Sequence, residues 1–543
     1  MPIDQDKLVG TLKAGLEDRR GATAVAFAIS LAVLAPMSLG VFDIYTTTQQ
    51  RAKLQDALDA AALYAAKSSA TTDADLDAAG EKSLKANLQL IKGATLIGAD
   101  FHGDGTKVVA SASVKLPAYA PTLYAHQPVE VGSQVERAMD DLEVALVLDN
   151  TGSMAQNHKI ETLRTEATKL VGKLEAAAAR SDHKDTAVKI ALVPFSFAVR
   201  PVAAVNLTNY NASNPAAAGV PAWIDPQGKN HLQAATPTYK YDIFSTMTDR
   251  LAIMSKLKGN TWAGCVEARA QPYDVTDDAP VAGAAATWFV PYFWPDEPDN
   301  PTTSGYANDY LTDAGGSDWT AIERNVAKYA NGANGFKNSR ETKTFKAAGG
   351  DYSYGPNAGC ALQPVIRLTN NMKSITDAIA KMDAIGTTNI PQGLAWGWHS
   401  LSPNLPFQDG RAYETKHLRK VIILMTDGEN TFLDAKTSAN LNQSDYTGLG
   451  YIWQKMLGIT DTDPFDDRTK KMDERVALLC KNAKDKKIEI YTILVEESST
   501  ASSTLLSNCA SSPSKFYNVQ NVATLGVAFD AIAGSITNMR LSH

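Results

Sequence analysis

The sequence predicts an α/β protein whose main domain is a doubly wound, mostly parallel sheet, preceded by a transmembrane helix and a small α+β module. Three observations lead to this fold class. Two uninterrupted apolar runs, 144–148 and 421–425, have the composition of strands buried on both faces of a parallel sheet. Segments with helical periodicity alternate with such strands, which is typical of a doubly wound sheet. Residues 21–42 carry no charge, which indicates a membrane span.

The main domain is predicted to occupy residues 139–543. Apolar residues at helical spacing predict a first helix over 160–174, and 188–197 is a second predicted strand. A long insertion, 202–363, rich in Asn, Asp, Gly, Pro and aromatic residues, then interrupts the alternation. The pattern resumes after residue 374 with a helix, a loop, a helix through Trp398, the 421–425 strand, a helix at 473–486, strands at 488–495 and 516–519, and a closing helix through 525–536.

Size and composition restrict the possible classes of protein. A chain of 543 residues exceeds one typical domain, and 44% hydrophobic with 20% charged residues is an ordinary globular composition. The formal net charge is −7, and the sequence has no basic cluster with interleaved aromatics. Both features argue against nucleic acid as a partner.

The uncharged stretch 21–42 lies between Arg20 and Asp43. At roughly 1.5 Å per residue, a helix of this length crosses the roughly 30 Å hydrocarbon core of a bilayer, and it exceeds the apolar core of a cleavable signal peptide. Arg19 and Arg20 directly precede it. The positive-inside rule therefore predicts that residues 1–20 are cytoplasmic and that the rest of the chain lies outside. The alternative is a buried core helix.

The segments after the span predict a stalk and a small module. Apolar residues at helical spacing continue the helix without a break, so 43–79 are expected to form a helical stalk. Alternating runs at 107–116 and 129–135 predict short antiparallel strands. We therefore expect 80–138 to form a small α+β module, in which no motif indicates chemistry.

The four cysteines include no C-x-x-C pair, which argues against a zinc site or a thioredoxin-like redox motif. Four cysteines allow three pairings, and the sequence alone does not choose among them. In an exported chain we favour Cys265 with Cys360, which both lie in the insertion, and Cys480 with Cys509, which flank one strand. The alternative is four buried free thiols.

Three oxygen-bearing side chains follow the 144–148 strand at every second position: Asp149, Thr151 and Ser153. The carboxyl end of a central strand is where ligands usually bind in an open α/β sheet. One carboxylate and two hydroxyls at this spacing can surround a single point. Such a hard-oxygen site is suited to Mg²⁺, with Mn²⁺ or Ca²⁺ as alternatives, and is poor for softer metals.

Two further segments extend this site. Asp427 follows the second apolar run, which places another carboxylate at the same kind of strand end. Residues 386–389 form a predicted tight loop just before Pro391, which can open a helix. Thr387 and Thr388 of this loop both offer hydroxyls.

The three segments, D-x-T-G-S-M, G-T-T-N-I-P-Q-G-L and L-M-T-D-G-E-N, resemble the metal-ion-dependent adhesion site of von Willebrand factor A domains. The family's usual first motif is D-x-S-x-S, and Thr151 keeps the hydroxyl. The resemblance implies that Thr151 and Ser153 bind the metal directly. Thr388, which matches the family pattern better than its neighbour, would bind directly or through water. Asp149 and Asp427 would bind mostly through water, and one position would stay open for a carboxylate from a protein partner.

A second resemblance covers the N-terminal segment. The stretches R-R-G-A-T-A-V-A-F-A-I and K-L-Q-D-A-L-D-A-A-A-L-Y-A-A look like the start of TadG-like and TadE-like proteins of the tight-adherence (Flp) pilus assembly system. Insertion segments 262–267 and 288–299 are also similar to TadG-like proteins carrying an A domain. The resemblance implies pilus assembly components as partners and a bacterial inner membrane location, with the bulk of the chain periplasmic or exposed in the envelope. Pilin-like members carry a Glu five residues after a cleaved Gly; Ala26 stands there, so we expect a retained anchor.

The sequence therefore predicts a non-enzymatic, membrane-anchored envelope protein with a metal-dependent adhesion site. One alternative is a metal-dependent phosphohydrolase or phosphotransferase with Asp149 or Asp427 as nucleophile, which would need a cation such as Lys at the strand ends. Lys159 begins a helix and is expected to point to solvent. Another alternative is a scaffold with an inactive metal site. The insertion is expected to form either a disulfide-stapled elaboration with its own core or a partner-binding surface.

Overall fold

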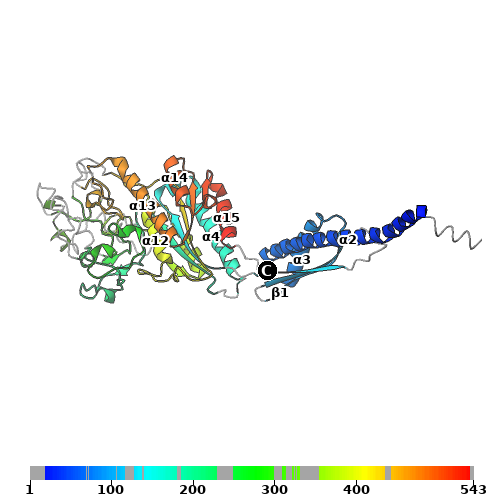
Figure 1. Cartoon of the computed structure of the whole chain (residues 1–543). Coiled ribbons are helices and arrows are strands. Elements are labelled where there is room, and N and C mark those ends of the chain that lie inside the picture. The colour runs from blue at the N-terminus through cyan, green and yellow to red at the C-terminus, as the bar shows by residue number, and fades with distance from the viewer. Residues whose placement is uncertain are drawn as a thin grey trace, which may run out of the picture. The chain divides into compact units, whose positions relative to one another are not determined.

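The computed structural model describes residues 19–537 apart from residues 69, 71, 105–106, 117–127, 137–139, 180, 182–184, 229–248, 258, 299–307, 314–320, 323–324, 326, 331–353, 435–441 and 461. The described residues form two compact units (Figure 1). The first lies mainly within Met1–Met139, and the second lies within Asp140–Ala179 and His183–Thr537.

The N-terminal unit combines two helices with a three-stranded antiparallel sheet. The helices are α2 (Arg19–Lys67) and α3 (Asp73–Leu88). The sheet consists, in order, of β1 (Thr95–Asp104), β2 (Lys107–Lys115) and β3 (Val129–Glu136). In Figure 1 the N-terminal part of α2 extends beyond the sheet.

One described helix stretch, Ala26–Lys67 of α2, is long and apolar enough to cross a membrane. Its first half exposes large apolar side chains, including those of Phe27, Ile29 and Leu34. A core helix would bury these groups, because exposed apolar surface is unfavourable in water. The structure therefore contradicts the alternative that this stretch is a core helix of the unit.

The second half of α2 forms the core of the N-terminal unit. Leu54, Leu58 and Ala65 of α2 are buried against α3 and the sheet. Phe101 of β1 and Val108 of β2 belong to the same buried cluster. The expected division between a stalk at 43–79 and a module at 80–138 does not separate two structural units. Helix α3 crosses that boundary, because the apolar faces of the helices and the sheet need one another for burial.

The second unit contains the predicted doubly wound sheet, and its strand order confirms the fold class. The order is β11-β10-β9-β4-β5-β8, and every neighbouring pair is parallel except β5 with β8, which is antiparallel. The strands are β4 (Asp141–Asp149), β5 (Val188–Phe195), β8 (Ile366–Thr369), β9 (Leu418–Thr426), β10 (Glu489–Val495) and β11 (Phe516–Val519). The central strands β4 and β9 are buried almost throughout, as their apolar runs predict.

Helices cover both faces of this sheet. Helices α4 (Lys159–Ala178), α11 (Met372–Ile379) and α15 (Leu525–Ile536) pack together. Helix α12 (Ile390–Leu401) lies across β4, β5 and β9 and packs against α13 (Phe465–Asp485), which contacts α14 (Thr500–Cys509). Figure 1 shows α4 and α15 on one side of the strands and α12 and α13 on the other.

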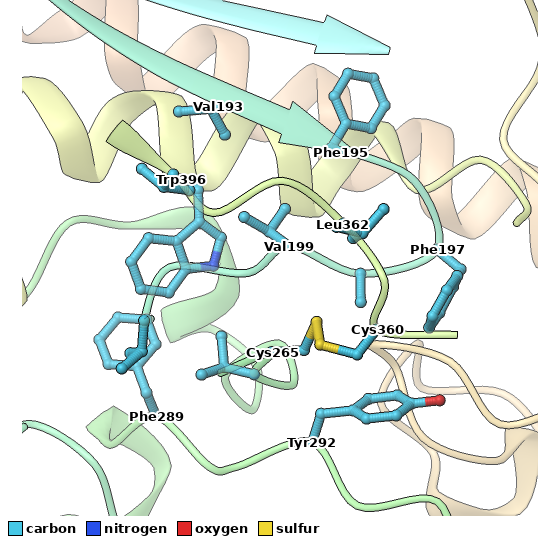
Figure 2. Packing of buried hydrophobic residues seen from close by; sticks show 14 of the residues in the cluster. Val193, Phe195, Phe197, Val199, Cys265, Phe289, Tyr292, Cys360, Leu362 and Trp396 are labelled. Carbon is cyan, nitrogen blue, oxygen red and sulfur yellow. A yellow bond between two sulfur atoms is a disulfide. The ribbon is translucent and has the colours of Figure 1, made fainter. Parts of the chain in front are cut away.

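The insertion shares the main core, so the expectation of a separate satellite core is wrong. Phe289 and Tyr292 are buried in one continuous cluster with Phe195 of β5 and Trp396 of α12 (Figure 2). Trp262 is buried in the same cluster. These aromatic side chains fill the interior, so they give no support to the alternative of an aromatic partner-binding surface. The α-helices and strands in the described part of the insertion are short: β6 (Val205–Asn206), α6 (Arg250–Met254), β7 (Thr261–Trp262) and α8 (Ala327–Ala330).

Both favoured disulfides are present, which confirms the predicted pairing. The Cys265–Cys360 bond lies inside the buried cluster beside Tyr292 (Figure 2), and Cys480–Cys509 joins α13 to α14. The first bond spans 95 residues of sequence and the second 29. The first bond therefore joins two parts of the insertion, and the second joins the two helices that flank β10.

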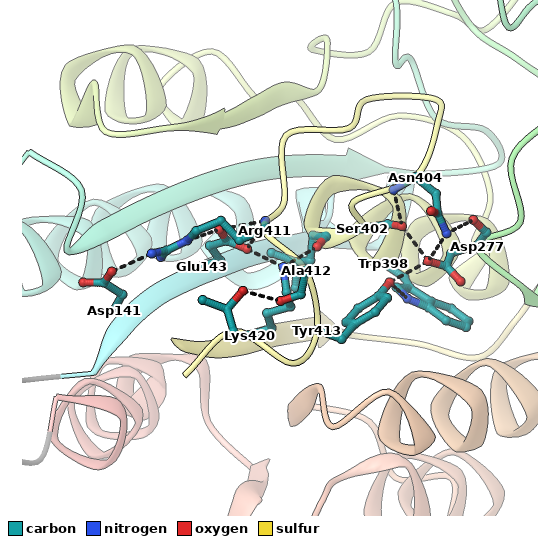
Figure 3. Close-up of polar contacts among 12 residues, drawn as sticks. Asp141, Glu143, Asp277, Trp398, Ser402, Asn404, Arg411, Ala412, Tyr413 and Lys420 are labelled. Carbon is teal, nitrogen blue, oxygen red and sulfur yellow. Dashed lines mark hydrogen bonds and ion pairs between the residues drawn. The ribbon is translucent and has the colours of Figure 1, made fainter. Parts of the chain in front are cut away.

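A buried ionic network supports the end of the sheet where β4 begins (Figure 3). Glu143 of β4 is fully buried and accepts hydrogen bonds from Lys420 of β9 and from Arg411, whose guanidinium also pairs with Asp141. The ammonium of Lys420 also donates to the carbonyl of Leu401 at 2.7 Å. This network aligns the two central strands, whose opposite ends hold the candidate site.

Candidate metal centre

Asp149 lies at the last position of β4, and both its carboxylate oxygens are fixed by hydrogen bonds. The backbone N–H of Thr151 donates to Oδ1 at 2.8 Å, and the hydroxyl of Thr426 donates to Oδ2 at 2.6 Å. Thr426 is the last residue of β9, and the parallel register of β4 with β9 brings the two strand ends together. The Asp149 carboxylate is thereby buried and oriented at the carboxyl edge of the sheet.

Hydrogen bonds connect the other predicted ligands of the first and third motifs. The hydroxyls of Thr151 and Ser153 lie 3.0 Å apart, and the Ser153 hydroxyl donates to Oδ1 of Asp427 at 2.6 Å. The short helical turn Gly152–His158 presents these hydroxyls toward the end of β9. The structure thus brings together Asp149, Thr151, Ser153 and Asp427.

Lys159 joins this cluster, so the expectation that it points to solvent is wrong. Its ammonium lies 2.8 Å from Oδ2 of Asp427, and only 7% of its side chain is exposed. Asn157 and His158 adopt left-handed backbone conformations, with φ of 52° and 57°. Helix α4 follows this reversal, and its first side chain, Lys159, faces the site.

Thr388 lies in a loop that is hydrogen-bonded to both of the other segments. The N–H of Gly152 donates to the Gly386 carbonyl at 2.9 Å, and the N–H of Thr431 donates to the Thr388 carbonyl at 2.8 Å. Thr388 is buried, whereas Thr387 is half-buried and lines a neighbouring cavity of about 170 Å³. The structure therefore positions the backbone of the Thr388 loop beside the two strand ends.

Two residues determine the local shape of this loop. Gly386 has a φ of +75°, and a Cβ there would lie 2.6 Å from the ring of Phe197. Asn389 caps α12, because its side chain accepts a hydrogen bond from the N–H of Gln392 at 3.2 Å. Pro391 occupies the first turn of α12, as predicted.

Two carboxylates and one buried ammonium determine the electrostatics of the cluster. Burial, and then the nearby charge of Asp427, raise the pKa of the Asp149 carboxyl from 3.8 to about 7, although its hydrogen bonds from Thr426 and Thr151 act in the opposite direction. Two carboxylates close together in a buried site disfavour the charged form. A divalent ion between them would offset this repulsion.

The donor set fits a hard, oxygen-preferring ion. The hydroxyls of Thr151 and Ser153 and the carboxylates of Asp149 and Asp427 are oxygen donors, the type of ligand that Mg²⁺ prefers. The hydroxyl of Ser196, at the same edge of the sheet, is buried without a hydrogen-bond partner among the described residues. No cluster of three His, Cys, Asp or Glu side chains suited to a metal occurs in the described part of the chain.

Sequence reasoning missed three residues of the site. Thr426, next to Asp427, holds Asp149; Lys159 pairs with Asp427; and Ser196 follows β5. A hydroxyl directly before a candidate ligand at a strand end was a usable signal for Thr426. The sequence contains no such signal for Lys159, because the direction of its side chain depends on two residues in left-handed conformations just before the helix.

The fold and the strand-end oxygens define the class: a doubly wound α/β protein with oxygen-bearing side chains at the carboxyl edge of its sheet and an apolar helix near its N-terminus. Residues 21–68 match a family described as putative Flp pilus-assembly TadE/G-like, which confirms the resemblance predicted for this segment. The match links the N-terminal segment to pilus assembly. No curated protein matches the chain.

Several solved structures are similar to this chain. The vWF domain of the type V pili tip protein Mfa5 from Porphyromonas gingivalis is 12% identical with a TM-score of 0.32, covering 75% of this chain and 98% of that one. An adhesive tip pilin from Group B Streptococcus agalactiae is 12% identical with a TM-score of 0.32, covering 73% and 100%. The pilus adhesin SpaC from Lactobacillus rhamnosus GG is 10% identical with a TM-score of 0.31, covering 82% and 34%. At these identities and TM-scores we draw no functional conclusion from the similarities.

Proposed function

We propose that this protein is a non-enzymatic, membrane-anchored envelope protein that binds a protein partner through a metal ion in tight-adherence pilus assembly, anchoring or surface adhesion. The observation that supports it best is the chain of hydrogen bonds from Thr151 through Ser153 to Asp427, with Asp149 beside it. Oxygen donors from distant segments gather there at one edge of the sheet, where ligands of such folds bind.

The metal in this proposal is Mg²⁺, or alternatively Mn²⁺ or Ca²⁺. Thr151 and Ser153 would bind it directly, Thr388 directly or through water, and Asp149 and Asp427 mostly through water. Because few anionic groups would touch it directly, the bound ion would remain electrophilic and attract a carboxylate of the partner. The protein groups would orient the ion and limit its access to water.

The proposed location is the bacterial inner membrane, with a single span and a cytoplasmic N-terminus. Arg19 and Arg20 precede the apolar stretch, which supports this orientation. Two disulfides in the second unit support an oxidising compartment such as the periplasm. The match of residues 21–68 to a pilus-assembly family supports pilus components as partners.

The test is Mn²⁺ and Mg²⁺ binding by the full-length protein in detergent, measured by calorimetry. Wild type is expected to bind one ion per chain, and Asp149→Ala to lose that binding. Asp485→Ala, which removes an exposed carboxylate on α13, is the matched control and should behave as wild type. Equal binding by wild type and Asp149→Ala would refute the proposed site.

One observation favours a second candidate function, metal-dependent phosphoryl transfer. That chemistry needs a cation near the nucleophilic carboxylate, and Lys159 occupies this place beside Asp427. Against it, hydrogen bonds or the ion pair engage both oxygens of Asp149 and of Asp427, which weakens either as a nucleophile. Turnover of phosphate esters by the metal-loaded protein, lost in Asp427→Asn, would establish this alternative; no turnover across a panel would exclude it.

A further inference from the structure

A buried ammonium group is built into the proposed metal site. Only 7% of the Lys159 side chain is exposed, and the Asp427 side chain that it contacts is fully buried. Its Nζ donates to Oδ2 of Asp427 at 2.8 Å, while Ser153 donates to Oδ1. Lysine is almost never buried unless it is paired, so the position of this side chain is determined by Asp427.

The formal charge of the cluster follows from these contacts. Asp427 contributes one negative charge and Lys159 one positive charge, so this pair is neutral, and Asp149, whose pKa is raised to about 7, adds at most one negative charge. Glu496 also interacts with Lys159, but its carboxylate is half-buried and accepts hydrogen bonds from Asn157 and from the N–H of Val522. Adding a divalent ion would make the net charge of Asp149, Asp427 and Lys159 positive.

We propose that Lys159 is a fixed counter-ion that lowers the affinity of the site for divalent metal and raises the affinity of the metal-loaded site for an anionic partner group. This inference rests on the proposed metal-binding function and adds a residue that controls it. Without metal, the ammonium compensates the charge of Asp427, which a buried carboxylate requires.

Two consequences follow from Coulomb's law in a site with low water access. A permanent cation close to the metal repels it, so removal of that charge should tighten metal binding. With metal bound, the same cation adds to the positive field acting on a carboxylate, so its removal should weaken carboxylate binding. If Lys159 served only in packing, its substitution would not both tighten metal binding and weaken carboxylate binding.

The experiment compares full-length wild type, Lys159→Met and Lys159→Gln in detergent. Methionine keeps most of the apolar stem, and glutamine keeps an N–H donor toward Asp427 without the charge. Lys169→Met is the control: it changes the same residue type on α4, where the ammonium is exposed and paired with Glu166. Mn²⁺ affinity is measured by calorimetry, and acetate binding to the Mn²⁺-loaded protein by water-proton relaxation.

Both Lys159 variants are expected to bind Mn²⁺ roughly tenfold more tightly or better, and to bind acetate several-fold more weakly. Their metal-free forms should melt at a lower temperature than wild type, and Mn²⁺ should raise their melting temperatures by more. If either variant is insoluble without metal, purification with Mg²⁺ followed by exchange into Mn²⁺ gives the same comparison.

The possible failures are distinguishable. Mn²⁺ binding by wild type together with unchanged or weaker binding by both variants would overturn the role of Lys159 while leaving the metal site intact. Absence of Mn²⁺ binding by wild type would overturn the proposed function and this inference together. Tighter Mn²⁺ binding without any loss of acetate binding would overturn the second half of the proposal.

Discussion

Ser153 donates a hydrogen bond to the carboxylate of Asp427 at 2.6 Å, although 274 residues separate them in the sequence. The bond joins the loop after β4 to the loop after β9. Because these strands are neighbours in the sheet, the two loops emerge at the same edge. This contact makes one site of two motifs that are far apart along the chain.

Thr426→Val is expected to weaken metal binding about 10- to 100-fold without unfolding the protein. The substitution preserves the shape of the side chain but removes the hydroxyl that holds Oδ2 of Asp149. Calorimetry with Mn²⁺ measures the effect. Thr431→Val, which alters a hydroxyl bonded only to the nearby Glu429 carbonyl, is the control. An unchanged affinity in Thr426→Val would show that Asp149 needs no positioning by this hydroxyl.

Gly386→Ala is expected to destabilise the second unit by about 1–3 kcal/mol and to reduce metal affinity. The added Cβ would lie 2.6 Å from the ring of Phe197, and the positive φ of Gly386 disfavours any side chain. Gly428→Ala is the matched control at the same edge of the sheet, since a Cβ there meets nothing within 4 Å. Urea unfolding and Mn²⁺ calorimetry measure the two effects; similar behaviour of both variants would contradict this account of the loop.

Loss of the Cys265–Cys360 bond is expected to cost more stability than loss of Cys480–Cys509. Chain entropy gives about 4.7 kcal/mol for the 95-residue separation and about 3.6 kcal/mol for the 29-residue separation. Double Cys→Ser variants, compared by guanidinium unfolding, test this order. Both bonds lie in the main core, but only Cys265–Cys360 joins two parts of the insertion, so its loss should loosen the insertion. The reverse order would show that the insertion is stabilised mainly by other contacts.

The stability of the second unit is expected to fall on acidification partly because of His399. Its imidazole is fully buried beside Phe289 and Trp396, and burial, followed by the charge of Arg269, lowers its pKa well below 6.5. In the unfolded chain the imidazole binds a proton below about pH 6.5, whereas in the folded chain it stays neutral. As the pH falls below that value, proton uptake by the unfolded chain therefore lowers the free energy of unfolding by up to about 1.4 kcal/mol per pH unit.

Urea unfolding of wild type and His399→Leu across this pH range measures the contribution. The variant should show a smaller loss of stability with falling pH, because one proton uptake by the unfolded state is removed. Other acidic and basic groups titrate in both proteins, so the difference between the two slopes isolates His399. Equal slopes would show that His399 is protonated in the folded protein.

Much of the fold followed from local patterns, and so did the meeting of Asp149, Thr151, Ser153 and Asp427 at one edge of the sheet. The apolar runs that end at Leu148 and Met425 became the buried central strands, and the polar residues after them came to one edge. Thr388 is only partly explained, because its loop is attached through backbone hydrogen bonds that side-chain patterns do not encode. The metal itself stays a prediction.

By itself, the sequence determined which segments are strands, helices and apolar span, because periodicity reports how each segment is buried. It also determined which oxygen-bearing side chains follow the central strands. Only the tertiary structure decided that Lys159 turns inward to Asp427, that the insertion's aromatics fill the main core, and that α2 and α3 share one core with the small sheet. The physical reason is that a local pattern shows that a side chain is buried, while contacts between distant segments decide what it is buried against.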